Sequence, residues 1–338
     1  ERNFMSTKEK IIKILEENRG RPVSGQMLSQ TIGVSRAAVN KAVNSLRISG
    51  FSIAASAGSG YVLSEKSDMI SAPAIRAGLN DELQELPLFV YASVTSTNDT
   101  AKNMAGSAAF INAAGNAAVI IANEQTSGKG RLDRSFHSPA DSGLYMSFLM
   151  KPSFDISRSG LLTTAASVAV SKAIEKLTDI EPQIKWVNDI FAFGKKVCGI
   201  LTEAVTSFES GQIESVVIGI GVNCSFTKVP DDIRDIYGAL YKHNRPAFRS
   251  RLAAEIINEF MLLTADLVPE NFLPYYRSHS MVLNHDVTVY KQGFGGGTPG
   301  RPAHAVAIDD TGGLTVRYED GVQETLTAGE ISIRLQNV

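Results

Sequence analysis

The sequence predicts an α+β protein of several domains, and three observations support this. The chain has 338 residues, more than a single hydrophobic core usually spans. Helical periodicity dominates the first part of the chain, a mixed helix and strand pattern starts at Leu88, and short β segments with Gly- and Asp-rich turns follow Asn284. We therefore expect domains over residues 5–66, 88–283 and 284–338, with a linker over residues 67–87.

Composition excludes several classes of protein. No segment approaches the ~18–20 uninterrupted apolar residues of a membrane span, and the N-terminal segment lacks the apolar core of a secretory signal. Cys198 and Cys224 are the two cysteines, so neither a disulfide framework nor a cysteine-based zinc site is expected. The five histidines contain no i,i+4 pair, which disfavours a histidine-based metal site. We expect a protein of the reducing cytoplasm with no membrane partner.

The formal net charge of −2 hides an uneven distribution of charge. The chain has 33 Lys and Arg against 35 Asp and Glu, but residues 1–67 carry five more basic than acidic side chains. The remainder carries seven more acidic than basic ones. A basic segment on an acidic body is typical of a domain that faces nucleic acid, although chance imbalance gives the same numbers.

Residues 6–66 predict three helices followed by a β-hairpin. Ser6 to Glu9 has the form of a capping box, and a helix should run from there to about Asn18. Ser24 can cap a second helix that ends at the turn of Gly33, and Ser35 can cap a third that ends near Gly50. Two short β segments then flank a small-residue turn over 57–60. This order of elements is that of a winged helix-turn-helix.

The third helix carries the predicted DNA contacts. Its apolar residues share one face, which leaves a polar and basic set on the other. Asn can pair with adenine, Arg with guanine, and Lys neutralises phosphate. A helical protein-contact domain is the alternative, and a single module would be expected to bind a two-fold operator as a dimer. The predicted DNA-binding residues are Ser35, Arg36, Asn40, Lys41, Asn44 and Arg47.

The central part alternates strands and helices, and the C-terminal part contains strands alone. Strands are expected at 89–92, 119–122, 144–150, 184–187, 196–204 and 215–223, with helices at 160–177 and 248–266. Short β segments follow at 287–290, 303–308, 314–318, 324–326 and 331–334. The Gly- and Asp-rich turns between them suggest a small β-barrel.

A basic loop follows the second strand of the central part. Residues 123–134 read Asn-Glu-Gln-Thr-Ser-Gly-Lys-Gly-Arg-Leu-Asp-Arg. Glycines let a backbone approach a ligand closely, and Lys129, Arg131 and Arg134 supply charge for phosphate or carboxylate. The segment is not a P-loop, because the Gly-Lys-Ser/Thr ending and the following helix are missing. An exposed basic loop without a ligand is the alternative.

A second polar cluster lies at the end of a predicted strand. Asn188 and Asp189 follow the chain's one tryptophan, Trp186, and their oxygens can hold Mg²⁺ or a nucleotide. Lys196 starts the next apolar strand, where a buried charge is costly unless it is used. A structural ion pair is the other interpretation of Lys196.

Together these motifs resemble those of the bifunctional biotin protein ligases that also act as biotin operon repressors, over nearly the whole chain. The family's Gly-Arg-Gly-Arg-Arg-Gly-Arg loop is similar to residues 128–134, and its Lys-Trp-Pro-Asn-Asp motif to residues 185–189. Its Gly-Lys-Lys-x-x-Gly-Ile-Leu-x-Glu motif matches residues 194–203, its Ser-Thr-Asn motif residues 96–98, and its Gly-x-Gly-x-Asn strand end residues 219–223. The resemblance implies a class II synthetase-like mixed α/β ligase domain and an SH3-like C-terminal barrel.

The resemblance also implies a two-step reaction. Biotin and MgATP give biotinyl-5′-AMP and pyrophosphate, and the acyl group then passes to a lysine of a biotin carboxyl carrier protein. The adenylate would act as corepressor and favour a homodimer on operator DNA. No covalent enzyme nucleophile is required, which agrees with the lack of a convincing Ser-His or Cys-His set.

Site residues follow by the same resemblance. The catalytic set is Arg131, Lys196 and Asp189, with Asp189 also the metal ligand. Biotin would contact Ser96, Thr97, Asn98, Gln125, Gly128, Lys129, Gly130, Arg131, Lys196 and Gly199. ATP would contact Lys129, Arg131, Arg134, Phe136, Lys185, Trp186, Asn188, Asp189 and Asn223.

Three departures and three alternatives remain. Leu132 and Asp133 replace Arg-Gly of the family loop, Val187 replaces Pro, and Phe136 replaces a usual Trp. We expect the less basic loop to close less firmly on the adenylate. The alternatives are a lipoate-type acyl-protein ligase, a biotin-sensing transcription factor without catalysis, and a ligase whose N-terminal domain no longer binds DNA.

Overall fold

The computed structural model describes residues 6–56, 60–106, 117–132, 134–151, 158, 160–206, 213–291, 299–327 and 332–335. The predictions for Asp133 and for most of the hairpin turn at 57–60 lie outside these residues. The chain divides into two compact units. The first comprises Glu1–Gln84 with His243–Glu255, and the second Glu85–Lys242 with Ile256–Val338.

The first unit contains the predicted three helices and hairpin. They are α1 (Thr7–Glu17), α2 (Gly25–Ile32), α3 (Arg36–Ile48), β1 (Ile53–Ser56) and β2 (Gly60–Leu63). Ser6, Ser24 and Ser35 cap the three helices as predicted, and Ser6 and Glu9 form the reciprocal capping box. Leu15, Leu28, Val39, Val43 and Leu63 belong to one buried cluster, so the helical faces predicted as apolar form the core.

The predicted linker is short helix and loop. It contains α4 (Ala72–Arg76) and a 3-10 turn, η1 (Asp81–Leu83). Asp68 forms a buried ion pair with Arg249, the second residue of α8 (Phe248–Thr264), with a distance of 2.8 Å from Nε to Oδ2. This pair joins the linker to the start of α8 within the first unit.

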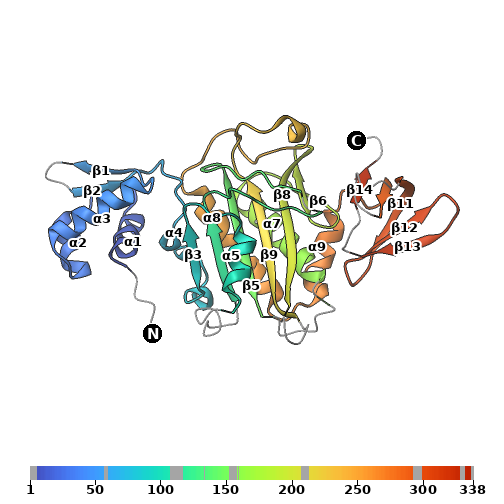
Figure 1. The fold of residues 1–338 in the computed structure, drawn as a ribbon, viewed down its shortest axis with the longest axis horizontal. Coiled ribbons are helices and arrows are strands. Elements are labelled where there is room, and N and C mark those ends of the chain that lie inside the picture. The colour runs from blue at the N-terminus through green and yellow to red at the C-terminus, as the bar shows by residue number, and fades with distance from the viewer. Residues whose placement is uncertain are drawn as a thin grey trace. The chain divides into compact units, whose positions relative to one another are not determined.

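A seven-stranded mixed sheet is the centre of the second unit (Figure 1). Its order is β3-β4-β5-β9-β8-β7-β6, and only the β3–β4 pair is parallel among these neighbours. The strands are β3 (Leu88–Tyr91), β4 (Ala117–Ala122), β5 (Gly143–Met150), β6 (Gln183–Lys185), β7 (Asp189–Ala192), β8 (Lys195–Thr206) and β9 (Ile213–Asn223). The sequence had not predicted β7, and Asp189 therefore begins a strand instead of following one.

The two faces of this sheet are covered differently. Helix α5 (Thr97–Met104) packs on β4, β5 and β9, with Ala101 against Ala118 and Val217. On the other face Phe148 contacts Phe260 of α8 at a ring-centroid distance of 4.4 Å. Thr163 of α7 (Gly160–Leu177) hydrogen-bonds Thr202 at 2.8 Å. Val217 of β9 packs in the same cluster as Ala101 of α5. Because side chains alternate along a strand, the odd-numbered residues of β9 point toward the α5 face.

The remaining elements of the second unit include a small antiparallel sheet. Its order is β13-β12-β11-β10-β14, and the pairings among the described residues do not close it into a barrel. Its strands are β10 (Asp286–Tyr290), β11 (Arg301–Ile308), β12 (Leu314–Tyr318), β13 (Gln323–Leu326) and β14 (Ser332–Leu335). Short helices η4 (Asp231–Ile233), η5 (Pro269–Asn271) and α9 (Leu273–Ser278) complete the described elements. Among the residues described, no helix combines the length and apolarity needed to cross a membrane.

Candidate active site

A cavity of about 380 Å³ lies over the α5 face of the large sheet. Its walls come from the first turn of α5, the basic loop, the β6–β7 turn and strands β8 and β9. An adjoining hollow of about 590 Å³ shares the basic loop and adds Gly128. The predicted site residues that line the first cavity are Ser96, Thr97, Asn98, Gln125, Lys129, Gly130, Arg131, Arg134, Phe136, Asn188, Asp189, Lys196 and Gly199.

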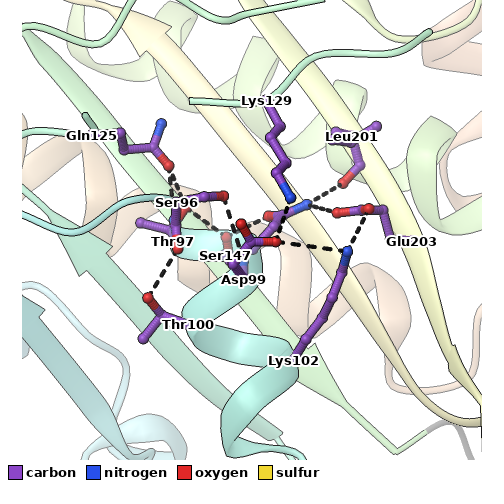
Figure 2. Close-up of polar contacts among 11 residues, drawn as sticks. Ser96, Thr97, Asp99, Thr100, Lys102, Gln125, Lys129, Ser147, Leu201 and Glu203 are labelled. Atoms are coloured by element: carbon purple, nitrogen blue, oxygen red, sulfur yellow. Dashed lines mark hydrogen bonds and ion pairs between the residues drawn. The ribbon is translucent and has the colours of Figure 1, made fainter. Parts of the chain in front are cut away.

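The Ser-Thr-Asn motif forms the N-terminus of α5. Ser96 is the N-cap, and its hydroxyl accepts from the backbone N–H of Asp99 at 3.4 Å. The backbone N–H and the hydroxyl of Thr97 both donate to Oε1 of Gln125, at 2.8 and 3.0 Å (Figure 2). The structure therefore brings together three residues that are predicted to contact biotin, Ser96, Thr97 and Gln125.

Asn98 is buried and links this turn to the central strands. Its amide donates to Oε2 of Glu203 at 2.7 Å and to the carbonyl of Leu201 at 3.3 Å, and its Oδ1 accepts from Ser147 at 2.6 Å. A Cβ on Gly219 would overlap Asn98 Oδ1, so the first glycine of Gly-x-Gly-x-Asn makes room for this side chain.

Sequence reasoning missed Ser147 and Glu203 as site residues. Glu203 ends a recognised motif, and this was a usable signal. Ser147 lies on the strand face opposite Met146 and Phe148, and its polarity within an otherwise apolar strand was the second signal. Register places it beside Gly219 on the α5 face.

Glycines form the floor of the cavity, and Phe136 lies over them. A Cβ on Gly199 would come within 3.2 Å of both the Phe136 ring and Lys196 Cε, and a Cβ on Gly221 would overlap the ring. The Phe136 ring also packs edge to face against the Tyr145 ring, with 6.5 Å between the ring centroids. Phe136, which is predicted to contact ATP, thus lies beside Gly199, which is predicted to contact biotin.

The basic loop is a tight hairpin. Phe136 N–H donates to the carbonyl of Gly128 at 2.8 Å, and Gly130 N–H donates to that of Arg134 at 2.7 Å. Arg131 reaches out of the hairpin and donates through Nη1 to Asn188 Oδ1 at 3.1 Å. Burial lowers the pKa of the Arg131 guanidinium, and the charge of Asp189 opposes this change. The guanidinium remains cationic, since arginine keeps its proton in proteins.

Lys196 and Asp189 form an ion pair with 2.6 Å between Nζ and Oδ1. Both side chains are about one-quarter exposed, at 27 % and 22 %, and both line the cavity. Asn188 is held beside them by a hydrogen bond from Nδ2 to the carbonyl of Ile200 at 2.8 Å. The ion pair that was the alternative interpretation of Lys196 is therefore present, and both of its residues line the cavity.

Three predicted nucleotide contacts lie outside the cavity lining. Trp186 is 4 % exposed, and its indole N–H donates to the carbonyl of Gly312 at 2.9 Å. Gly312 lies between strands β11 and β12 of the small antiparallel sheet. Lys185 Nζ lies 5.7 Å from the centre of the Phe191 ring. Asn223 donates to the carbonyl of Gly238 at 2.9 Å. Each of these residues has a structural contact, and the nucleotide roles stay predictions.

The predicted DNA-binding face is present on α3. Arg36, Asn40, Lys41 and Asn44 are exposed, while Ser35 caps the helix. Asn40 and Asn44 hydrogen-bond each other at 3.0 Å, and Asn40 also reaches Tyr61 of the hairpin at 3.3 Å. Arg47 differs, because its Nε donates to the carbonyl of Ile53 at 2.8 Å and so ties α3 to the hairpin.

Fold and site define a class, an acyl-protein ligase domain joined to a helix-turn-helix domain. A family model described as "Biotin/lipoate A/B protein ligase family" matches residues 90–223. An "HTH domain" model matches residues 7–62, and a "Biotin protein ligase C terminal domain" model residues 297–334. The chain is 31% identical over 333 residues to "Bifunctional ligase/repressor BirA" of Bacillus subtilis, covering 94% of this chain and 96% of that protein. The chain therefore belongs to the BirA family of bifunctional ligase/repressor proteins.

Two further comparisons agree with this. The Escherichia coli protein of the same name is 27% identical over 319 residues, covering 92% of each chain. A biotin protein ligase from Aquifex aeolicus in complex with biotin and ATP is a similar solved structure. Its TM-score is 0.58 at 25% identity, over 74% of this chain and 99% of that one.

Proposed function

We propose that this chain is an ATP-dependent biotin protein ligase and a biotin-responsive repressor. It forms biotinyl-5′-AMP and transfers biotin to a lysine of a biotin carboxyl carrier protein. The observation that carries the proposal is the convergence of the Ser-Thr-Asn turn, the basic loop, Asn188 and Asp189, and Lys196 on one cavity. Family membership supports the same activity, because relatives are named for both ligase and repressor.

The first step brings two anions together. A carboxylate oxygen of biotin attacks the α-phosphorus of ATP, and the bond to the β-phosphate breaks to release pyrophosphate. Lys196 exchanges its Asp189 partner for the substrate carboxylate, and Arg131 faces the phosphate from the loop. Fixed cations of this kind stabilise charge more effectively in a partly buried site than in water. The Ser96–Asn98 turn and Gln125 hold the ring system of biotin.

The second step needs no covalent enzyme intermediate. The ε-amine of the carrier lysine attacks the acyl carbon, the bond to AMP breaks, and the amine loses a proton to form the amide. A cavity that opens between the loop and the sheet lets the carrier lysine approach the adenylate.

Magnesium fits the donor set as an ion that arrives with ATP. Mg²⁺ usually takes one or two protein carboxylates and completes its shell with phosphate oxygens and water. Asp189 supplies one carboxylate beside the Asn188 amide. No cluster of three or more metal-binding His, Cys, Asp or Glu occurs among the residues the structure describes. Bound there, the ion would neutralise phosphate charge.

The repressor role rests on α3 and its family. We propose that the exposed face of Arg36, Asn40, Lys41 and Asn44 contacts operator DNA, and that the adenylate favours a homodimer. We also propose that residues 284–338, which contain the small antiparallel sheet, form an SH3-like domain. We further propose that the domain built on the seven-stranded mixed sheet is class II synthetase-like.

Transfer of biotin to a purified carrier domain tests the enzyme directly. Mass spectrometry should show ATP-dependent addition of one biotin to the carrier, and lipoate should give no product. A chain that binds biotin without modifying the carrier would be a sensor only. A gel-shift assay with the promoter of the chain's own gene, with and without biotin and ATP, tests the repressor function. The absence of a shift under both conditions would contradict that function.

A further inference from the structure

One ion pair joins the basic loop to helix α5, and a second joins α5 to strand β8. Lys129 Nζ lies 2.7 Å from Asp99 Oδ1, and Lys102 Nζ lies 2.6 Å from Glu203 Oε1. Lys102 also lies 3.9 Å from Asp99, so one carboxylate faces two lysines. Figure 2 shows Lys129 descending from the loop and Lys102 rising from the helix toward Asp99 and Glu203.

We propose that Asp99 is a positioning residue that clasps the basic loop onto the first turn of α5 through Lys129. Asp99 follows Ser96–Asn98 directly, and that turn lines the cavity with residues that are predicted to contact biotin. The clasp therefore couples the loop to the ring-binding turn. It rests on the proposed ligase function, because its consequence is retention of biotin and the adenylate.

A second set of contacts holds the first turns of α5, which carry Asp99, against strand β8. Asn98 and Lys102 both bond to Glu203, which places the helix turn on β8. Asn98 is 4 % exposed and Glu203 26 % exposed, so the support is more sheltered than the outer pair, in which Lys129 is 44 % exposed. An exposed pair is screened by salt and contributes modestly. The clasp accordingly adjusts loop closure and does not create the site.

The Lys129–Asp99 pair also offsets the reduced positive charge of this loop. The resembled family loop carries an Arg-Gly pair where this chain has Leu132 and Asp133, so this loop has less positive charge to hold an anionic ligand. The ion pair to Asp99 on α5 favours the closed loop by a modest amount and so offsets part of the weaker attraction to the ligand.

Two measurements on the full-length protein test the clasp. In the ligand-free protein, Asp99→Asn should speed tryptic cleavage in the basic loop, as mapped by mass spectrometry. In the enzyme loaded with biotin and ATP, it should raise the release rate of the adenylate about two- to fivefold, the scale of one exposed ion pair. The KM for biotin should rise with it while kcat stays within about twofold.

Three variants show whether Asp99 acts through Lys129. Asp99→Glu should restore slow release, and Asp99→Asn should add nothing in a Lys129→Gln background. Asp320→Asn, which breaks an exposed ion pair with Arg301 in the small sheet, is the matched control and should leave both readouts unchanged. Rising ionic strength should speed release from the unaltered enzyme more than from Asp99→Asn.

The outcomes separate the two proposals. If the unaltered chain forms no adenylate, the ligase function fails and the clasp has no role. If it forms adenylate while Asp99→Asn leaves both cleavage and release unchanged, the clasp alone is wrong. Equal effects of Asp99→Asn with and without Lys129 would show that it acts on the fold and would also overturn the proposal.

Discussion

Gly219 of β9 lies so close to Asn98 that a Cβ on the glycine would overlap Asn98 Oδ1. Asn98 is in turn bonded to Ser147 and Glu203, at 2.6 and 2.7 Å. Two motifs that lie more than one hundred residues apart in sequence therefore meet at one backbone position. The glycine is required by this contact, because its φ is not in the left-handed region.

Gly219→Ala should displace Asn98 and weaken biotin binding. Overpacking a filled site costs roughly 1–3 kcal/mol, so we expect biotin affinity to fall about tenfold or more. Isothermal titration calorimetry measures the affinity. Gly106→Ala is the control, because a Cβ there meets no atom of the described residues within 4 Å. Unchanged biotin affinity in Gly219→Ala would show that Asn98 can move without cost to the site.

Trp186→Phe should destabilise the fold more than it impairs ATP use. The substitution removes the indole N–H and leaves the carbonyl of Gly312 without this donor, which costs about 1–3 kcal/mol. Urea unfolding measures the stability, and steady-state kinetics the KM for ATP. A large rise in KM with unchanged stability would instead support the nucleotide contact predicted from the sequence.

Breaking the Asp68–Arg249 pair should be severe. Arg249 is 1 % exposed and Asp68 6 % exposed at the side chain, so Asp68→Ala leaves a buried cation without its carboxylate. Loss of one partner of a buried pair costs about 3–5 kcal/mol, whereas replacing both by apolar residues is often neutral. Asp68→Leu with Arg249→Met should therefore recover most of the stability measured by urea unfolding.

The control for that experiment is an exposed pair. Arg277 lies 2.7 Å from Asp310, which is 89 % exposed at the side chain. Asp310→Ala should cost no more than about 1 kcal/mol. Similar losses for Asp68→Ala and Asp310→Ala would show that burial does not decide the contribution of the Asp68–Arg249 pair.

The sequence predicted the local features of the fold well, because capping residues and periodicity act within a few residues of each other. Ser6, Ser24 and Ser35 cap the three helices where the pattern placed them. Strand β7 was missed because it is only four residues long and directly follows the turn that contains Asn188. The order of strands in the sheet depends on long-range pairing, on which no single segment carries information.

The site shows the same division. Motif residues such as Ser96, Asn188 and Lys196 line one cavity, as expected for residues that share a ligand. The Lys129–Asp99 contact could not be predicted, because it depends on how the loop folds back over α5. Trp186 was assigned to the nucleotide from its neighbours in sequence, and its burial against the small sheet depends on packing that sequence spacing does not encode.

Restoring the family's loop charge should tighten the grip on the nucleotide. Leu132 has φ of 56°, a left-handed conformation that costs a non-glycine residue roughly 1–3 kcal/mol, and it is 39% exposed at the edge of the cavity. Leu132→Arg with Asp133→Gly adds one cation and removes one anion from the loop. We expect the KM for ATP and the rate of adenylate release to fall about three- to tenfold, since each exposed charge contact contributes at most about 1 kcal/mol. Pyrophosphate exchange and single-turnover release assays measure the two quantities. Leu132→Gly, which relieves the backbone without adding charge, is the matched control, and a paired variant no better than this control would show that loop charge does not limit nucleotide retention.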